Sequence, residues 1–197
     1  MTTLSASSSD WAFITGKWEK TEAGLEYSGP RQQDDSIPHG IALSDISSSG
    51  GDLSVVVKFE TNLDKGDAIQ ILLGYNAATG EYYSAGIGGY GYAYVINRYN
   101  PARGWSGLFV KGDIANIKSG EEYRLKVRID GQKIRLLVNG VRVLENNLPT
   151  PLPGTQTGLF AWGRTKVLFS SFEVLTARPK AFVVMQFSVF LGFFLNN

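Results

Sequence analysis

The stretch EEYRLKVRID, residues 121–130, constrains the fold more than any other part of the sequence. Its apolar and charged residues alternate strictly, which is typical of a β-strand with one buried and one solvated face. The residues on the apolar face are Tyr123, Leu125, Val127 and Ile129. Asp130-Gly131 and Asn139-Gly140 then favour two tight turns, because these pairs tolerate the positive φ of two-residue hairpins. The segment therefore predicts a three-stranded antiparallel meander.

Short strand-like segments separated by Gly, Asn and Asp turns fill the rest of the chain. In 53–60 the apolar face would carry Leu53, Val55, Val57 and Phe59. Further strands are predicted within 11–29, 39–45, 68–75, 81–87, 92–98, 105–111, 157–163 and 166–175. No window has a helical period, and 23 glycines accompany these short strands. The fold class is therefore all-β, an antiparallel β-sandwich.

Charge and composition exclude several kinds of partner. The 19 basic and 18 acidic residues nearly cancel, so we expect neither nucleic acid nor an anionic membrane surface as a partner. The chain has no Cys, which excludes disulfides and thiolate metal sites. Residues 1–9 carry no basic and apolar signal pattern, so we predict a flexible N-terminus and a cytoplasmic location.

The order of these segments resembles the concanavalin A-like lectin/glucanase superfamily. The motifs that carry the resemblance are W-x-x-x-x-G-x-W from Trp11 to Trp18, VVVKFE, ILLGYNAATGEYYSAGIGG, YRLKVRIDGQKIRLLVNGVRVLE and GLFAWGRTKVLFSSFEV. The sequence is most similar to laminin G-like and related bacterial sandwich domains. This resemblance implies a jelly-roll sandwich over residues 10–176. The motifs that carry it are structural, so they indicate the fold better than they indicate a ligand.

Glucanases of this superfamily carry catalytic carboxylates as E-x-D-x-E on one strand, because side chains two residues apart share a face. That triplet is absent from this sequence, so we expect no glycosidase activity and no catalytic residues. Some laminin G-like domains bind calcium, and Asp64, Asp67 and Asp113 are the candidate ligands. We interpret these three as solvated turn residues, and the single His39 as a loop or strand-edge residue that is hydrogen-bonded locally, so no metal and no cofactor is expected.

Residues 81–105 gather tyrosines and glycines and form the candidate binding segment. Aromatic faces stack on the C–H faces of sugars, while amide, phenol and guanidinium groups bond hydroxyls. Ordinary cross-strand packing of tyrosines is the competing interpretation. Along 92–98, we predict that Tyr92, Tyr94 and Ile96 occupy an open face and Ala93, Val95 and Asn97 a packed one. The candidate ligand-binding residues are Tyr90, Tyr92, Tyr94, Arg98 and Trp105, whereas Trp11, Trp18 and Trp162 are predicted core residues.

The last segment, residues 177–197, is apolar. Twelve of the fifteen residues from Ala181 to Leu195 are apolar, too few for a membrane span, which needs about twenty. A final sandwich strand is an alternative, but 166–175 already supplies the closing strand. RPKAFVVMQF is similar to the opening of bacterial TIR-like and nucleoside-deoxyribosyltransferase-like domains, whose first strand is buried on both faces. We therefore predict the truncated start of a second domain, whose apolar tail promotes self-association.

The sequence thus favours a non-catalytic recognition domain for a glycan or a similar polyhydroxylated ligand, within a longer protein. The alternative is a protein-interaction or sensor module for a TIR-like effector domain, with a protein partner and no carbohydrate binding.

Overall fold

The computed structural model describes residues 2–5, 10–29, 39–61, 66–112 and 117–176 of the 197-residue chain. The described residues form strands joined by turns and loops. The strands are β1 (Thr2–Ser5), β2 (Trp11–Thr15), β3 (Trp18–Thr21), β4 (Gly24–Ser28), β5 (Gly40–Ser47), β6 (Gly51–Phe59), β7 (Ala68–Tyr75), β8 (Tyr82–Gly88), β9 (Tyr94–Asn100), β10 (Gly104–Lys111), β11 (Glu122–Asp130), β12 (Lys133–Val138), β13 (Val141–Asn147), β14 (Gln156–Trp162) and β15 (Lys166–Thr176). Within these ranges, no helix is long and apolar enough to cross a membrane.

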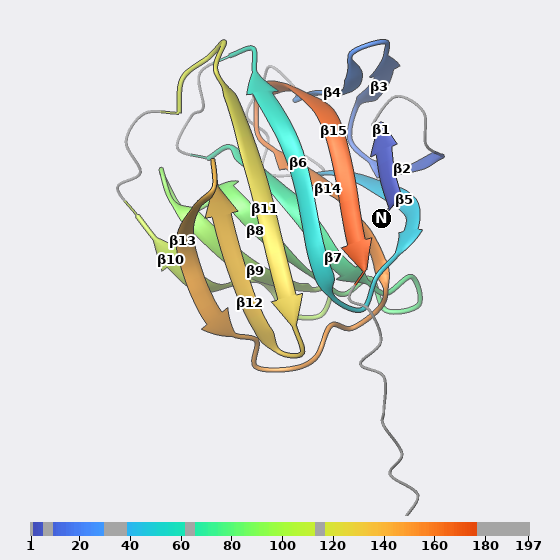
Figure 1. Cartoon of the computed structure of the whole chain (residues 1–197), viewed down its shortest axis with the longest axis vertical. Helices are drawn as coiled ribbons and strands as arrows, with labels where there is room; N and C mark the ends of the chain where they lie inside the picture. The colour runs from blue at the N-terminus through green and yellow to red at the C-terminus, as the bar shows by residue number, and fades with distance from the viewer. Residues whose placement is uncertain (1, 6–9, 30–38, 62–65, 113–116, 177–197) are drawn as a thin grey trace, which may run out of the picture.

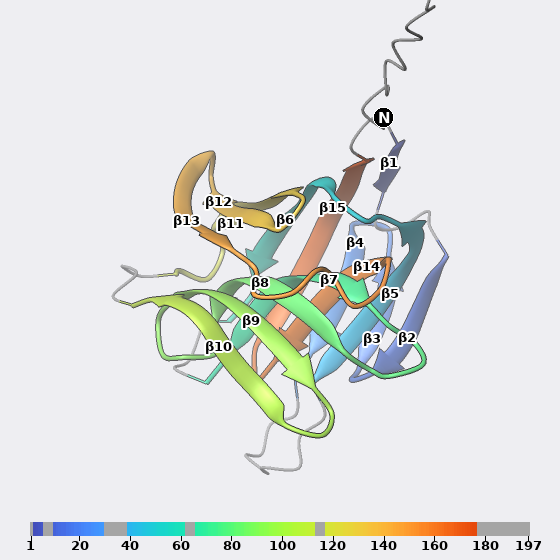
Figure 2. The same cartoon turned by 90° about the horizontal axis from the view of Figure 1, so that it is seen from below.

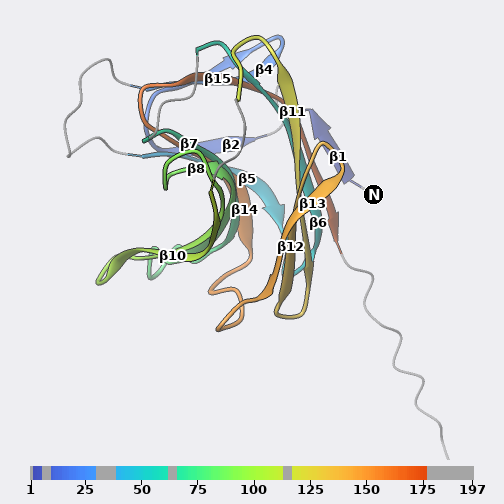
Figure 3. The ribbon, with the colours of Figure 1, turned by 90° about the vertical axis from the view of Figure 1, so that its left-hand side faces the viewer.

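The strands pair antiparallel in two layers. Sheet A has the order β13-β12-β11-β6-β15-β4-β3, and β1 pairs with β15. Sheet B has the order β10-β9-β8-β7-β14-β5-β2. Figure 1 looks onto sheet A, and Figures 2 and 3, from below and from the side, show sheets A and B as two stacked layers. The predicted all-β antiparallel sandwich is confirmed.

The meander from β11 to β13 follows the predicted pattern. All four alternate apolar residues of β11 are buried, and β12 pairs with β11 from Asp130↔Lys133 onward. Asn139 at the second turn has a φ of 50°, the left-handed conformation that favours an Asn-Gly turn. Because only one face of this part of sheet A is covered, the sequence pattern and the burial pattern coincide.

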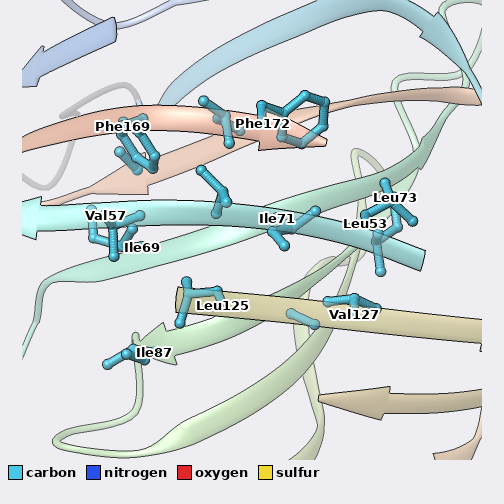
Figure 4. Close-up of a cluster of buried hydrophobic side chains, with 14 of the residues drawn as sticks. Leu53, Val57, Ile69, Ile71, Leu73, Ile87, Leu125, Val127, Phe169 and Phe172 are labelled. Carbon is cyan, nitrogen blue, oxygen red and sulfur yellow. The ribbon is translucent and has the colours of Figure 1, made fainter. Parts of the chain in front are cut away.

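The core lies between the two sheets. The predicted apolar face of β6, Leu53 to Phe59, packs there against the inward residues Ile69, Ile71 and Leu73 of β7. Figure 4 shows part of this cluster, with Leu53 and Val57 of β6, Ile69, Ile71 and Leu73 of β7, and Phe169 and Phe172 of β15. Trp11 is buried in this core and Trp18 packs against it, as predicted.

Two of the predictions concern the ends of the chain. Thr2–Ser5, placed by the sequence in a flexible N-terminus, pair with β15 as β1, because an edge beside β15 is open to another strand. The predicted start of a second domain at 177–197 lies outside the described residues.

Candidate functional site

The outer face of sheet B, the face turned away from sheet A, carries a second apolar cluster. Alternation along β7 sends Ile69, Ile71 and Leu73 into the core between the sheets, and Ala68 and Leu72 to this outer face. The buried members of the outer cluster are Ile41, Leu43, Ala68, Leu72, Tyr82 and Phe160. Sheet B therefore carries buried apolar side chains on both faces, whereas the outer face of β11 in sheet A is solvated.

Aromatic rings from strands far apart in the sequence meet on this face. Trp105 of β10 has its ring centroid 5.0 Å from Tyr99 of β9 and 5.0 Å from Phe160 of β14. Trp162 of β14 lies 5.9 Å from Trp105. His39, which immediately precedes β5, contacts all four of these rings at 5.6–6.2 Å. The strand order of sheet B brings these side chains together.

A pocket of about 220 Å³ opens beside these rings. Its lining residues are Ala68, Gln70, Gly89, Tyr90, Asn97, Trp105, Phe160 and Trp162. Tyr90, in the loop between β8 and β9, lies over Gly107 of β10, where a Cβ would come within 2.8 Å of the ring. Gly107 is the cross-strand partner of Asn97, so the Tyr90 ring passes close to the lining residue Asn97.

The polar part of the pocket consists of amides. Gln70 Oε1 accepts hydrogen bonds from Ser84 Oγ at 2.6 Å and from Asn97 Nδ2 at 3.2 Å. Gln70 Nε2 donates to the Gly88 carbonyl oxygen at 3.4 Å. Asn97 is only 3 % exposed, and none of the described residues donates a hydrogen bond to its Oδ1. A buried amide oxygen without a partner is rare, because leaving it unpaired destabilises the fold.

The surroundings favour neutral groups. Burial lowers the pKa of His39 below its ordinary 6.5, because removal from water disfavours the charged form of the imidazole. Burial also raises the pKa of Tyr90, and a backbone hydrogen bond from Gly107 partly offsets this. None of the eight described lining residues is charged. The described residues contain no group of three or more His, Asp or Glu that could hold a metal ion.

The structure brings two of the five predicted binding residues to the pocket, namely Tyr90 and Trp105. Tyr92 is 41 % exposed and precedes β9, outside the pocket lining. Tyr94 packs against the core between the sheets, and Arg98 lies over the inward ring of Tyr83 at 5.9 Å. Arg98 also bonds Glu81 at 3.4 Å.

The predicted faces of β9 are the reverse of those observed. Tyr94 and Ile96 turn toward the core between the sheets, whereas Asn97 is on the pocket side. The prediction assumed that the small and branched residues mark a packed face and the tyrosines an open one. Both faces of this strand are packed, so side-chain size did not distinguish them.

Two further residues lie elsewhere than predicted. Trp162 lines the pocket instead of the core. His39 is a loop residue at the edge of β5, as predicted, and its ring packs among the outer aromatic rings. Asp67 is 3 % exposed and accepts a hydrogen bond from the Arg164 backbone N–H at 2.9 Å, so it is not a solvated turn residue. Asp64 and Asp113, the other calcium candidates, lie outside the described residues. The G-L-x-x-W motif contained Trp162, but nothing local to it indicates which face it occupies.

No family model and no curated protein matches the sequence. Among solved structures, the carbohydrate-binding module CBM66 from Bacillus subtilis is similar, with a TM-score of 0.66, 16% identity, and coverage of 82% of this chain and 92% of that one. A prokaryotic β-1,3-1,4-glucanase (lichenase) from a mouse hindgut metagenome gives a TM-score of 0.64 at 13% identity, covering 87% and 96%. The chain has the concanavalin A-like β-sandwich fold. A Bacillus subtilis protein of unknown function with a galectin-like fold is also similar, with a TM-score of 0.60, 12% identity, and coverage of 83% and 87%. This fold serves both binding modules and enzymes, so function has to be argued from the pocket.

Proposed function

We propose that the protein is a non-catalytic recognition domain that binds a sugar ring in the outer-face pocket of sheet B. The observation that carries this proposal is the combination of aromatic walls and an amide floor in one pocket. Aromatic faces pack on the C–H faces of a sugar, and amides bond its hydroxyls. The similarity to a carbohydrate-binding module over most of both chains supports the same conclusion.

The size of the pocket favours a single ring over a long oligosaccharide. Its volume of about 220 Å³ is below the roughly 300–1,000 Å³ of sites for drug-sized ligands. One sugar unit would enter, while neighbouring units would extend past the exposed Tyr90 into solvent.

The lining residues support binding without hydrolysis. Glycoside hydrolysis generally requires two carboxyl groups that flank the scissile bond. The described lining residues offer aromatic rings, two amides, Ala68 and Gly89, and none of them carries a carboxyl group. The nearby Asp67 is engaged by the backbone of Arg164.

Two tyrosines of one loop provide a matched test. Tyr90 and Tyr92 are 44 % and 41 % exposed, but only Tyr90 lines the pocket. The wild type, Tyr90→Ala and Tyr92→Ala would be applied to a glycan array, and the binding of any hit would be titrated by tryptophan fluorescence. We expect Tyr90→Ala to weaken binding by about 1 kcal/mol, which is roughly fivefold, and Tyr92→Ala to leave it unchanged. Equal losses in the two variants would contradict the assignment of the pocket.

A blank array for the wild-type protein would contradict sugar binding altogether. That result would favour the alternative, a protein-interaction or sensor module. Repeating the array with residues 177–197 deleted would exclude interference by the apolar C-terminal segment.

A further inference from the structure

The hydrogen-bond chain beneath the pocket determines which way its amides face. The Gly88 carbonyl oxygen only accepts, so the group that Gln70 turns toward it must be the donor Nε2. This places Gln70 Oε1 toward Ser84 and Asn97. Asn97 must then present its donor Nδ2 to Gln70, because the reverse orientation would set two carbonyl oxygens against each other.

That chain leaves Asn97 Oδ1 as a buried acceptor that no donor of the described part of the protein reaches. It belongs to a residue of the pocket lining on the outer face of sheet B. We infer that Asn97 Oδ1 is the specificity-determining acceptor of the pocket and that it selects a ligand with a hydroxyl donor at this position. This inference rests on the proposed sugar binding, and it defines the ligand unit as an uncharged ring with a required free hydroxyl.

The chemistry of the lining disfavours ligands that present only acceptors. A carboxylate or carbonyl group would face Asn97 Oδ1 with a second acceptor, and no cationic side chain among the described residues lines the pocket to compensate. A hydroxyl satisfies the acceptor and adds no charge to a low-dielectric pocket. Buried sites built for a hydroxyl discriminate strongly against analogues that lack it, because the polar group of the protein is then left unpaired.

Access to this acceptor involves Tyr90. Its ring lies over Gly107, directly across the ladder from Asn97. Glycines with positive φ flank it, Gly89 at 91° and Gly91 at 71°. These conformations suit glycine, and a Cβ at Gly91 would meet no atom within 4 Å, so the tip of the loop has room to move. Displacement of the Tyr90 ring by the ligand would open the path to Asn97 Oδ1 and place the ring against the sugar.

A stability comparison tests the free acceptor without any ligand. Ser84 and Asn97 each donate one hydrogen bond to Gln70 Oε1, so Ser84→Ala and Asn97→Leu each remove one of its two donors. Only Asn97→Leu also removes an unpaired buried oxygen, and Leu has nearly the shape of Asn. We expect Ser84→Ala to lower Tm by roughly 2–4 °C and Asn97→Leu to lower it less or to raise it. An equal or larger loss in Asn97→Leu would overturn the inference, because Asn97 would then be a structural residue.

A ligand comparison tests the donor. The probes are the methyl glycosides of glucose, galactose, mannose and fructose, followed by the monodeoxy analogues of the tightest binder. We expect one deoxy analogue to bind the wild type about tenfold more weakly and to show no such loss relative to its parent sugar with Asn97→Leu. If every deoxy analogue loses affinity by the same factor with the wild type and with Asn97→Leu, then Asn97 does not recognise a hydroxyl and the inference fails. If no glycoside binds the wild type, the proposed function fails, while the Tm comparison still decides whether Asn97 holds an unpaired acceptor.

Discussion

Substituting Gly107 tests whether Tyr90 forms a movable wall of the pocket. A Cβ at Gly107 would lie 2.8 Å from Tyr90 Cζ and 3.1 Å from its hydroxyl oxygen. To restore an ordinary contact of 3.4 Å from 2.8 Å, the ring has to move by about 0.6 Å. The ring belongs to an exposed side chain on a loop, and Gly107 itself has no positive φ, so Ala introduces no backbone strain.

The matched control is Gly86→Ala on the same outer face of sheet B. Its Cβ would lie 2.3 Å from the Ile69 carbonyl oxygen and 2.7 Å from Gln70 Cα, both in the backbone of β7. Because β7 pairs with β8 and β14, this backbone has no room to yield. Overpacking of this kind costs about 1–3 kcal/mol, or roughly 2–12 °C in Tm for a domain of this size.

For Gly107→Ala we expect a different outcome. The reduced freedom of the unfolded chain contributes about 0.4–1 kcal/mol of stability, which offsets the displacement of Tyr90, so Tm should stay within about 3 °C of wild type. Sugar affinity should change, because the displaced ring no longer meets the ligand in the same place. Calorimetry of both variants and titration of the array ligand measure the two effects. A Tm loss in Gly107→Ala as large as in Gly86→Ala, or unchanged affinity, would refute the reasoning.

Three further predictions concern charge and packing. Hydrogen bonds from Arg128 lower the pKa of Asp52 from its ordinary 3.8 to about 2. This ion pair therefore stabilises the fold above pH 3.8, and the stabilisation is lost as the pH falls through 2. We expect Asp52→Asn to lower the free energy of unfolding in urea by about 1 kcal/mol at pH 7 and by almost nothing at pH 2. Tyr94→Ala should lower the free energy of unfolding by roughly 1–3 kcal/mol, since Tyr94 packs against the core, whereas a loss no larger than that of Tyr92→Ala would show that it does not. Because the pKa of His39 is lowered in the folded protein, the unfolded chain binds a proton on His39 at higher pH than the folded chain does, so wild-type stability should fall as the pH drops below 6.5. We expect His39→Phe to remove this part of the pH dependence of thermal unfolding. A pH profile identical to that of the wild type would contradict this prediction.

The sequence predicted the strands wherever one face of a sheet meets water. In β11 the charged residues Arg124 and Arg128 mark the solvated side, so the pattern predicted both the strand and which of its faces is buried. In β9 the same reasoning located the strand but reversed its faces. Val95, Ile96 and Asn97 are all buried there, since sheet A covers one side and the outer rings cover the other.

Part of the pocket was visible in the sequence as the tyrosine-rich segment that holds Tyr90 and Trp105. The other wall, Phe160 and Trp162, comes from β14, more than fifty residues later in the chain. Gln70 belongs to the earlier strand β7, where apolar residues flank it on both sides in the sequence. Nothing in any one segment indicates that these side chains converge.

The sequence by itself determined the strand segments, the tight turns and the burial of one face of sheet A, because side-chain alternation and turn residues act within a few positions of the chain. Only the tertiary structure decided which face of sheet B each residue occupies and which residues line the pocket. The physical reason is that a strand buried on both faces carries no polar side to orient it, so its orientation follows from the register with its neighbours. In β9 that register sets Tyr94 opposite Ile87 on the core side and Asn97 opposite Ser84 on the pocket side.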